Sequence, residues 1–180
     1  MPYKVLITDY AWPTLNIEMR VLGQVGAELL VPQTDSVEDA IGLAPQADAI
    51  LVNWNRCPAR VIAAASKCLV IVRYGVGVDN IDIEEATRQG IIVCNVPDYC
   101  MDEVSNEAMA MLLAGARRLF LYDRAIRSQV WGVKVGMPFP RLRGLTVGII
   151  GFGRIGKAVA AKAQPFGLRV RAYDPYIDQE

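Results

Sequence analysis

Short apolar runs alternate with segments of helical spacing along the first hundred residues. The runs 49–52 and 69–72 contain no polar residue, which is typical of strands covered on both faces. After Pro13, apolar side chains recur at the three- and four-residue spacing of a helix face. We predict strands at residues 4–8, 27–31, 49–52, 69–72 and 91–94, and helices at residues 13–22, 36–44, 58–66 and 82–90.

Polar residues mark where two of these helices begin. Ser36 followed by Asp39 resembles a capping box, and Asp82 with Glu85 is a second helix start that Gly90 closes at the far end. Strands that alternate with helices at this spacing favour a parallel sheet joined by right-handed crossovers. The pattern therefore predicts an α/β fold.

The pattern changes in the second half of the chain. The sequence of residues 102–127 predicts one long helix, whose stability Gly115 lowers slightly. Residues 128–144 hold several glycines and prolines and predict an irregular connector. A strand at 145–150, a helix to about 166 and a strand at 168–173 complete one βαβ unit.

Composition narrows the classes of function. The chain has 180 residues, 53% of them hydrophobic and 21% charged, which is a globular composition. Lysine plus arginine and aspartate plus glutamate number 19 each, so the net charge gives no reason to expect nucleic acid or an anionic membrane as partner. The longest apolar stretch, 108–116, is too short to cross a bilayer.

Cysteine and histidine usage adds two expectations. The four cysteines form no C-x-x-C pair and no secretory signal precedes them, so we expect no metal site and free thiols in a reducing cytoplasm. The chain has no histidine. Chemistry that needs imidazole as a general acid or base cannot run on this chain alone.

The segment from Gly151 to Gly156 reads Gly-Phe-Gly-Arg-Ile-Gly and fits G-x-G-x-x-G between a predicted strand and helix. The first glycine permits the tight turn, Gly153 lets a pyrophosphate approach, and the third allows close packing of helix on strand. Free N–H groups at the helix start would hold the phosphates. Asp174, at the end of the next strand, would bind the ribose hydroxyls and favour NAD over NADP. The alternative is a plain βαβ turn with an incidental aspartate.

Five blocks in order carry a family resemblance: Arg73-Tyr-Gly-Val-Gly-Val-Asp-Asn-Ile-Asp82, Gly90-Ile-Ile-Val-Cys-Asn-Val-Pro97, Asp102-Glu-Val-Ser-Asn-Glu-Ala with the later Ala-Arg-Arg118, the strand and glycine-rich turn of residues 145–156, and Tyr173-Asp-Pro175. Together they resemble the D-2-hydroxyacid dehydrogenase family, over residues 3 to about 176. The resemblance implies a flavodoxin-like parallel-sheet substrate domain at 1–98, a linking helix at 99–127, and a truncated Rossmann βαβ unit, the first half of an NAD-binding domain, at 128–180.

The resemblance also implies binding residues. The N–H groups around Val76 and Gly77 would face the substrate carboxylate and the nicotinamide end of NAD, and Asn53 and Trp54 would lie in a substrate-selective loop. The alternatives are an ordinary turn at 76–77 and a packing role for Trp54. The implied cofactor residues are Val76, Gly151, Phe152, Gly153, Arg154, Ile155, Gly156 and Asp174. Asp79, Asn80 and Asp82 are interpreted as turn and cap residues.

The implied activity is NAD-dependent oxidation of a 2-hydroxyacid at its CH–OH group, or reduction of the 2-oxoacid. Relatives continue past the Asp-Pro motif with a catalytic arginine, glutamate and histidine, so we expect no catalytic residue here, an inactive chain and weak NAD binding. The alternative is a catalytically inactive half-protein that binds a nucleotide or partner. Asn106 and Glu107 stand where many relatives have an acidic residue and a histidine.

We also expect self-association, as a homodimer or a larger assembly. One βαβ unit cannot cover its own apolar faces, and its sheet edge is open. The apolar residues that need a cover are Val147, Ile149, Ile150 and Val170.

Overall fold

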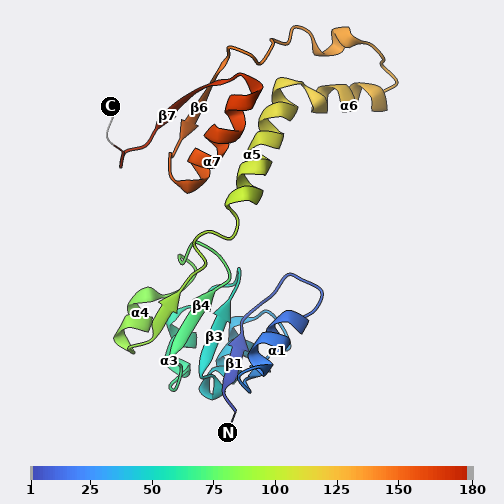
Figure 1. Ribbon diagram of the computed structural model, residues 1–180. Helices are drawn as coiled ribbons and strands as arrows, with labels where there is room; N and C mark the ends of the chain where they lie inside the picture. The colour runs from blue at the N-terminus through green and yellow to red at the C-terminus, as the bar shows by residue number, and fades with distance from the viewer. Residues whose placement is uncertain (1, 178–180) are drawn as a thin grey trace. The chain divides into compact units, whose positions relative to one another are not determined.

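The computed structural model describes residues 2–177, which form two compact units that divide between Tyr99 and Cys100 (Figure 1). The first unit carries a five-stranded sheet in which all strand pairs are parallel. The strand order is β2-β1-β3-β4-β5, which is the flavodoxin-like order. The predicted α/β fold class is confirmed. The strands are β1 (Lys4–Ile7), β2 (Glu28–Leu30), β3 (Ala49–Val52), β4 (Val70–Arg73) and β5 (Ile92–Cys94).

Helices α2, α3 and α4 bury their apolar residues against this sheet. The core contains Ile50 and Ile71 from the central strands and Val61 and Ile62 from α3, all of them fully buried. Each such side chain contributes about 1.5–3 kcal/mol when it leaves water. The helices are α1 (Asn16–Gly23), α2 (Val37–Leu43), α3 (Ala59–Ala64) and α4 (Ile83–Arg88), with a 3₁₀ turn η1 (Ala44–Gln46).

Both predicted helix starts are confirmed. The Ser36 side chain accepts a hydrogen bond from the Asp39 N–H at 3.1 Å, and Asp82 accepts one from the Glu85 N–H at 2.9 Å. Each cap satisfies a backbone donor that has no partner inside its helix. The caps fix where the chain turns from the sheet into α2 and α4.

The second unit is built from one βαβ motif and the two α-helices that precede it. Strands β6 and β7 pair in parallel, from Thr146 beside Arg169 to Ile150 beside Tyr173. Its elements are α5 (Met101–Ala116), α6 (Leu119–Arg127), η2 (Val133–Gly136), β6 (Thr146–Ile150), α7 (Arg154–Ala163), η3 (Gln164–Phe166) and β7 (Arg169–Tyr173). Figure 1 shows α5 and α7 side by side.

The prediction of one uninterrupted helix over 102–127 is wrong. Arg118 has a left-handed backbone with φ of +55°, and the chain changes direction there between α5 and α6 (Figure 1). The Arg118 guanidinium donates to the Pro138 carbonyl at 3.0 Å, and the Arg117 guanidinium lies 4.4 Å from the centre of the Phe139 ring. These contacts with the connector accompany the break, and helix propensity does not predict them.

Helix α5 covers part of the βαβ motif. Val147 and Val170 pack against a small core that contains Met109 of α5, so the expectation that they need a further partner is wrong. Ile149 is half-buried, whereas Ile150 is 90% exposed. The open part of the motif is therefore the sheet face that carries Ile150.

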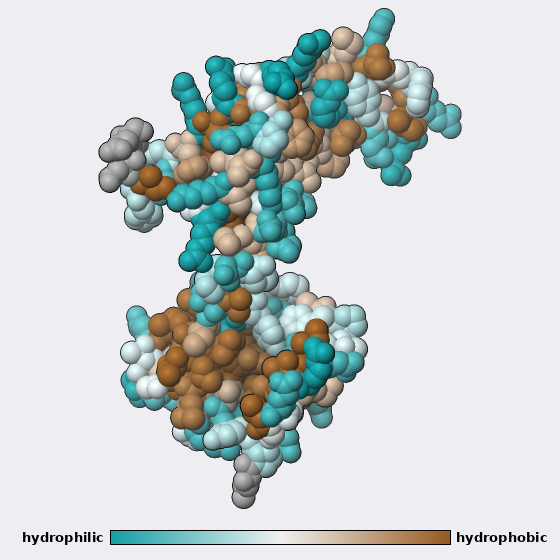
Figure 2. Space-filling view, in the orientation of Figure 1, coloured by the Kyte–Doolittle hydropathy of each residue, from teal (hydrophilic) through white to brown (hydrophobic). Residues whose placement is uncertain are grey.

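Apolar side chains also reach the surface of the first unit. Figure 2 shows a broad hydrophobic area on the visible face of this unit. Leu69 and Ile92, at the β5 side of the sheet, are largely exposed. Within residues 2–177, no helix is long and apolar enough to cross a membrane.

Candidate functional site

The glycine-rich turn joins β6 to α7, and two of its glycines are required by the fold itself. Gly151 has φ of +89°, a conformation that side chains other than glycine rarely adopt. Its N–H donates to the Tyr173 carbonyl at 2.8 Å. A Cβ on Gly156 would collide with the Gly151 carbonyl oxygen. The tight turn and the close approach of α7 therefore depend on these two residues.

Gly153 is different, because nothing in the fold requires a glycine there. Its φ is −72°, and a Cβ built on it would meet no atom within 4 Å. Among the described residues, the N–H groups of Gly153 and Ile155 have no hydrogen-bond acceptor. They lie at the N-terminus of α7, where the helix dipole favours an anion. The glycine leaves open space above these backbone donors.

Asp174 lies beside this turn. One carboxylate oxygen accepts the Phe152 N–H at 2.7 Å, and the other accepts the Tyr176 N–H at 2.9 Å. The Tyr176 and Phe152 backbone donors, with a smaller effect from the Lys157 charge, lower the pKa of the Asp174 carboxyl. The carboxylate is therefore ionised at neutral pH. The structure brings Asp174 and the turn together, as the sequence predicts.

The remaining residues of the turn surround this backbone. Phe152 is half-buried, while Arg154 and Ile155 are exposed at the first turn of α7. The turn therefore presents backbone donors, one acidic group and one basic side chain at the same end of the βαβ motif.

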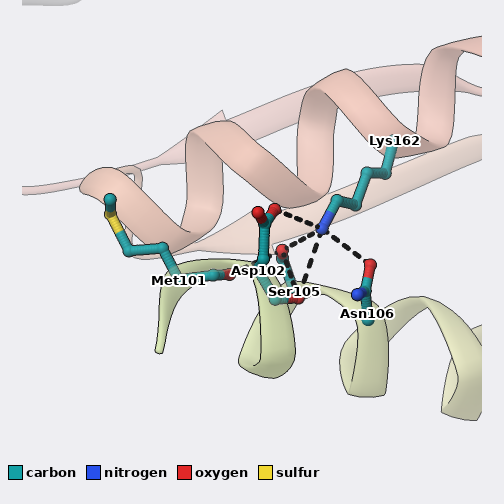
Figure 3. A network of polar contacts seen from close by, with 5 residues as sticks. All are labelled: Met101, Asp102, Ser105, Asn106 and Lys162. Carbon is teal, nitrogen blue, oxygen red and sulfur yellow. Dashed lines mark hydrogen bonds and ion pairs between the residues drawn. The ribbon is translucent and has the colours of Figure 1, made fainter. Parts of the chain in front are cut away.

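A polar network that the sequence analysis missed holds α7 against α5 (Figure 3). Lys162 Nζ donates to Ser105 Oγ at 2.6 Å, to Asn106 Oδ1 at 2.7 Å and to Asp102 Oδ1 at 3.1 Å. Ser105 is fully buried and donates in turn to the Met101 carbonyl at 2.6 Å. The spacing of 102, 105 and 106 places these groups on one helix face, but nothing in the sequence indicates Lys162 as their partner.

In the first unit, the loop after β4 carries Val76 and Gly77. It is tied down through its carbonyls, since Asn95 Nδ2 donates to the Val76 oxygen at 2.7 Å and the Val96 N–H donates to the Gly75 oxygen at 3.0 Å. Within residues 2–177, the N–H groups of Val76 and Gly77 have no acceptor. The loop therefore offers two backbone donors to a ligand such as a carboxylate.

Tyr74 anchors the start of the same loop. Its hydroxyl donates to Glu18 Oε1 at 3.3 Å, and its ring meets the edge of Trp12 at 5.0 Å between ring centres. Burial, reinforced by the Glu18 charge, raises the pKa of the Tyr74 hydroxyl. The phenol stays protonated at neutral pH and serves as a hydrogen-bond donor.

The loop after β3 carries Asn53 and Trp54, which face different surroundings. The Asn53 side chain is buried at 5% exposure, and its Nδ2 has no hydrogen-bond partner within residues 2–177. Trp54 is 71% exposed. Of the two residues that the resemblance places in a substrate-selective loop, the side chain open to solvent is that of Trp54.

Two residues that the sequence analysis did not assign to a site hold this loop. Asp9 is buried, and its carboxylate accepts the backbone N–H groups of Asn53, Trp54 and Asn55 at 3.2, 2.8 and 3.1 Å. Asn80 Nδ2 donates to the carbonyls of Asn53 and Asn55 at 3.0 and 2.9 Å. An acidic residue directly after a buried strand was the available signal for Asp9.

Two of the four cysteines are buried. All four are free, and burial raises the pKa of the Cys57 thiol to about 12. Burial also raises the pKa of Cys68. Over the described part of the chain, no three histidine, cysteine, aspartate or glutamate side chains are grouped so that they could hold a metal ion.

Comparison with known proteins shows the family of this chain. Residues 5–163 match the family described as D-isomer specific 2-hydroxyacid dehydrogenase, catalytic domain. The chain belongs to the D-isomer specific 2-hydroxyacid dehydrogenase family. The family resemblance seen in the sequence is thereby confirmed.

Individual relatives in this dehydrogenase family cover most of the chain. It is 40% identical over 178 residues to a D-3-phosphoglycerate dehydrogenase of Archaeoglobus fulgidus, covering 98% of this chain and 33% of the relative. It is 44% identical over 125 residues to a glyoxylate reductase of Thermococcus kodakarensis, covering 66% of this chain and 38% of the relative. The chain thus spans about a third of the length of the curated relatives it matches.

A solved dehydrogenase has the same fold. The 3-phosphoglycerate dehydrogenase of Entamoeba histolytica, a crystal structure with NAD+ bound, superposes with a TM-score of 0.80 at 27% identity. The similarity covers 100% of this chain and 56% of that one. The fold of both units is therefore a family property.

Proposed function

We propose that this chain supplies the pyrophosphate turn and the substrate-side loops of an NAD-dependent oxidoreductase that acts on the CH–OH group of a 2-hydroxyacid. The observation that carries the proposal is the glycine-rich turn, where the N–H groups of Gly153 and Ile155, which have no acceptor within residues 2–177, lie beside the ionised Asp174. The residues of this turn, 151–156, would hold the diphosphate, as peptide amides do at other helix N-termini.

Asp174 would set the choice of cofactor. Each of its oxygens accepts one backbone hydrogen bond, which leaves lone pairs for the ribose hydroxyls of the adenosine half. Its negative charge would repel a 2′-phosphate, so NAD is favoured over NADP. When bound, NAD accepts or donates the hydride. We propose that its affinity for this chain is weak, because the second half of the sheet normally completes the pocket.

Val76 and Gly77 would bind the substrate. Among residues 2–177 their N–H groups have no acceptor, and they would orient the carboxylate of a 2-hydroxy or 2-oxo acid. Asn53 and Trp54 would border the remaining part of the acid. We propose that the first unit is the substrate domain (residues 1–98), followed by a linking segment at 99–127 and a nucleotide-binding segment at 128–180.

We also propose that the protein is cytoplasmic and that it self-associates. Four unpaired thiols suit a reducing compartment such as the cytoplasm. Exposed apolar groups in the second unit, among them Phe120, Trp131 and Ile150, support self-association as a homodimer or larger assembly. Light scattering that finds only a monomer would contradict this part of the proposal.

Gly153 gives the sharpest test of the nucleotide site. Gly153→Val adds a side chain where the fold has open space and a φ that valine adopts, so the melting temperature should stay the same. The valine would cover the backbone donors, and NADH affinity should fall about tenfold or more, or ~1.4 kcal/mol. The control is Gly148→Val, which also adds a side chain in open space, on β6.

The NADH affinity is measured by fluorescence titration of the three chains. Equal affinity of the Gly153→Val and unsubstituted chains would remove the nucleotide assignment. A separate assay follows NADH oxidation with glyoxylate, pyruvate or hydroxypyruvate. Because the chain contains no histidine, the 180-residue polypeptide alone should show no turnover, and a rate above that of buffer would refute this expectation.

A further inference from the structure

The strand order of the first unit creates a recognised type of binding position. In the order β2-β1-β3-β4-β5, β1 and β3 are neighbours at the point where the chain reverses its direction across the sheet. Open α/β sheets bind ligands outside the carboxyl ends of the strands at such a point, and flavodoxin-like proteins hold a phosphate group there. In this chain, Asp9 follows β1 and the loop Asn53–Asn55 follows β3.

Here the chain's own carboxylate takes the place of an external anion. Asp9 is 6% exposed and accepts three successive backbone N–H groups, those of Asn53, Trp54 and Asn55, at 2.8–3.2 Å. It also accepts the Thr8 hydroxyl at 2.8 Å. All four donors are neutral, so oriented dipoles surround the Asp9 carboxyl group, as they surround a bound anion in a backbone nest.

Asn80 fixes the opposite edge of the same loop. Its side-chain Nδ2 donates to the carbonyls of Asn53 and Asn55, and its backbone carbonyl accepts the Cys57 N–H at 2.8 Å. Asn80 belongs to the segment that also carries Val76 and Gly77. The two loops assigned above to substrate binding are thus joined through one side chain.

The result is a rigid loop with an exposed aromatic ring. Both N–H and carbonyl groups of the loop Asn53–Asn55 are bound by side chains from elsewhere in the unit, while the Trp54 indole is largely open to solvent. Trp54 thus has an exposed ring on a backbone that hydrogen bonds hold in place. Such a residue is well suited to ligand contact, because little backbone entropy is lost on binding.

We propose that Asp9 is a positioning residue: its carboxylate fills the anion position between β1 and β3 and thereby holds Trp54 ready for the substrate. The inference rests on the proposed function, which places Trp54 at the substrate. The N–H groups of the loop Asn53–Asn55 already donate to Asp9, which agrees with the proposed binding of the substrate carboxylate by the N–H groups of Val76 and Gly77. Asn80 is the second positioning residue of this loop.

The test uses the full 180-residue chain with Trp12→Phe and Trp131→Phe, so that Trp54 is the only tryptophan. Time-resolved fluorescence anisotropy measures its local motion. Asp9→Ala should raise the amplitude of the fast nanosecond depolarisation on the order of twofold. Formate, which replaces the missing carboxylate, should restore the original value in a saturable way.

Two further variants keep the result decisive. Asp9→Asn retains the size of the side chain but has one acceptor oxygen, so it should raise the motion without rescue by formate, and it replaces Asp9→Ala if that chain does not fold. Asn80→Ala should raise the motion independently. The matched control is Asp35→Ala, because the exposed Asp35 contacts the loop through its backbone carbonyl alone, and it should change nothing.

Unchanged Trp54 motion in Asp9→Ala, Asp9→Asn and Asn80→Ala, or an equal formate response in the control, would overturn the inference. A glyoxylate titration of Trp54 emission separates this outcome from failure of the proposed function. If glyoxylate leaves the emission of the parent single-tryptophan chain unchanged, the substrate role of the loop fails, whereas the anisotropy still decides whether Asp9 and Asn80 hold it.

Discussion

Replacing Lys162 by methionine tests how α7 is held against α5. Methionine keeps an unbranched stem and good helix propensity, so the change removes the ammonium group and little else. The variant lacks the hydrogen bonds that Lys162 donates to Ser105, Asn106 and Asp102. Because α7 begins at the glycine-rich turn, this contact also bears on how firmly the turn is placed.

The magnitude follows from the exposure of each partner. The Asp102 side chain is 86% exposed, so its ion pair with Lys162 contributes at most about 1 kcal/mol. The bond to the buried Ser105 oxygen is charge-assisted, and such bonds contribute about 1.5–3 kcal/mol. Ser105 keeps its own acceptor, the Met101 carbonyl, which reduces the cost. We expect a loss of about 1–3 kcal/mol.

Native-state hydrogen exchange of the amides of α5 and α7 measures this loss. The matched control is Lys157→Met, an exposed position on the same helix. The free energy of unfolding should fall for Lys162→Met and change by less than about 0.5 kcal/mol for the control. Equal effects of the two substitutions would refute the reasoning.

Three further predictions concern packing, pH and thiol reactivity. Gly156→Ala should lower the free energy of unfolding by about 1–3 kcal/mol in calorimetry, because its Cβ meets a rigid carbonyl; an unchanged melting temperature would contradict the turn geometry. The Arg88 guanidinium lowers the pKa of Glu85 to about 2, so this pair stabilises the fold above pH ~4.5 and loses that effect as the pH falls towards 2. Acid titration of Glu85→Gln should lack this component, and an identical profile would argue against the pair. The exposed Cys94 should react quickly with a thiol reagent while Cys57 reacts after unfolding only, and rapid labelling of Cys57 would contradict its burial.

The sequence by itself determined the strands, the two helix caps and the glycine-rich turn. Each depends on residues close together in the chain: apolar runs for the strands, Ser36 and Asp82 three residues before their N–H donors, and glycines at fixed spacing in the turn. Steric limits and local hydrogen bonds act over such short separations, so the pattern of residues is sufficient to predict them.

The tertiary structure alone decided the break at Arg118, the partner of Lys162 and the loop held by Asp9. Asp9 is separated by 44 to 46 residues from the N–H groups it binds, and it meets them because β1 and β3 are neighbours in the sheet. Lys162 lies 57 residues from Ser105 and reaches it through the packing of α7 on α5. Such contacts depend on which elements become adjacent, and local periodicity carries no information about that choice.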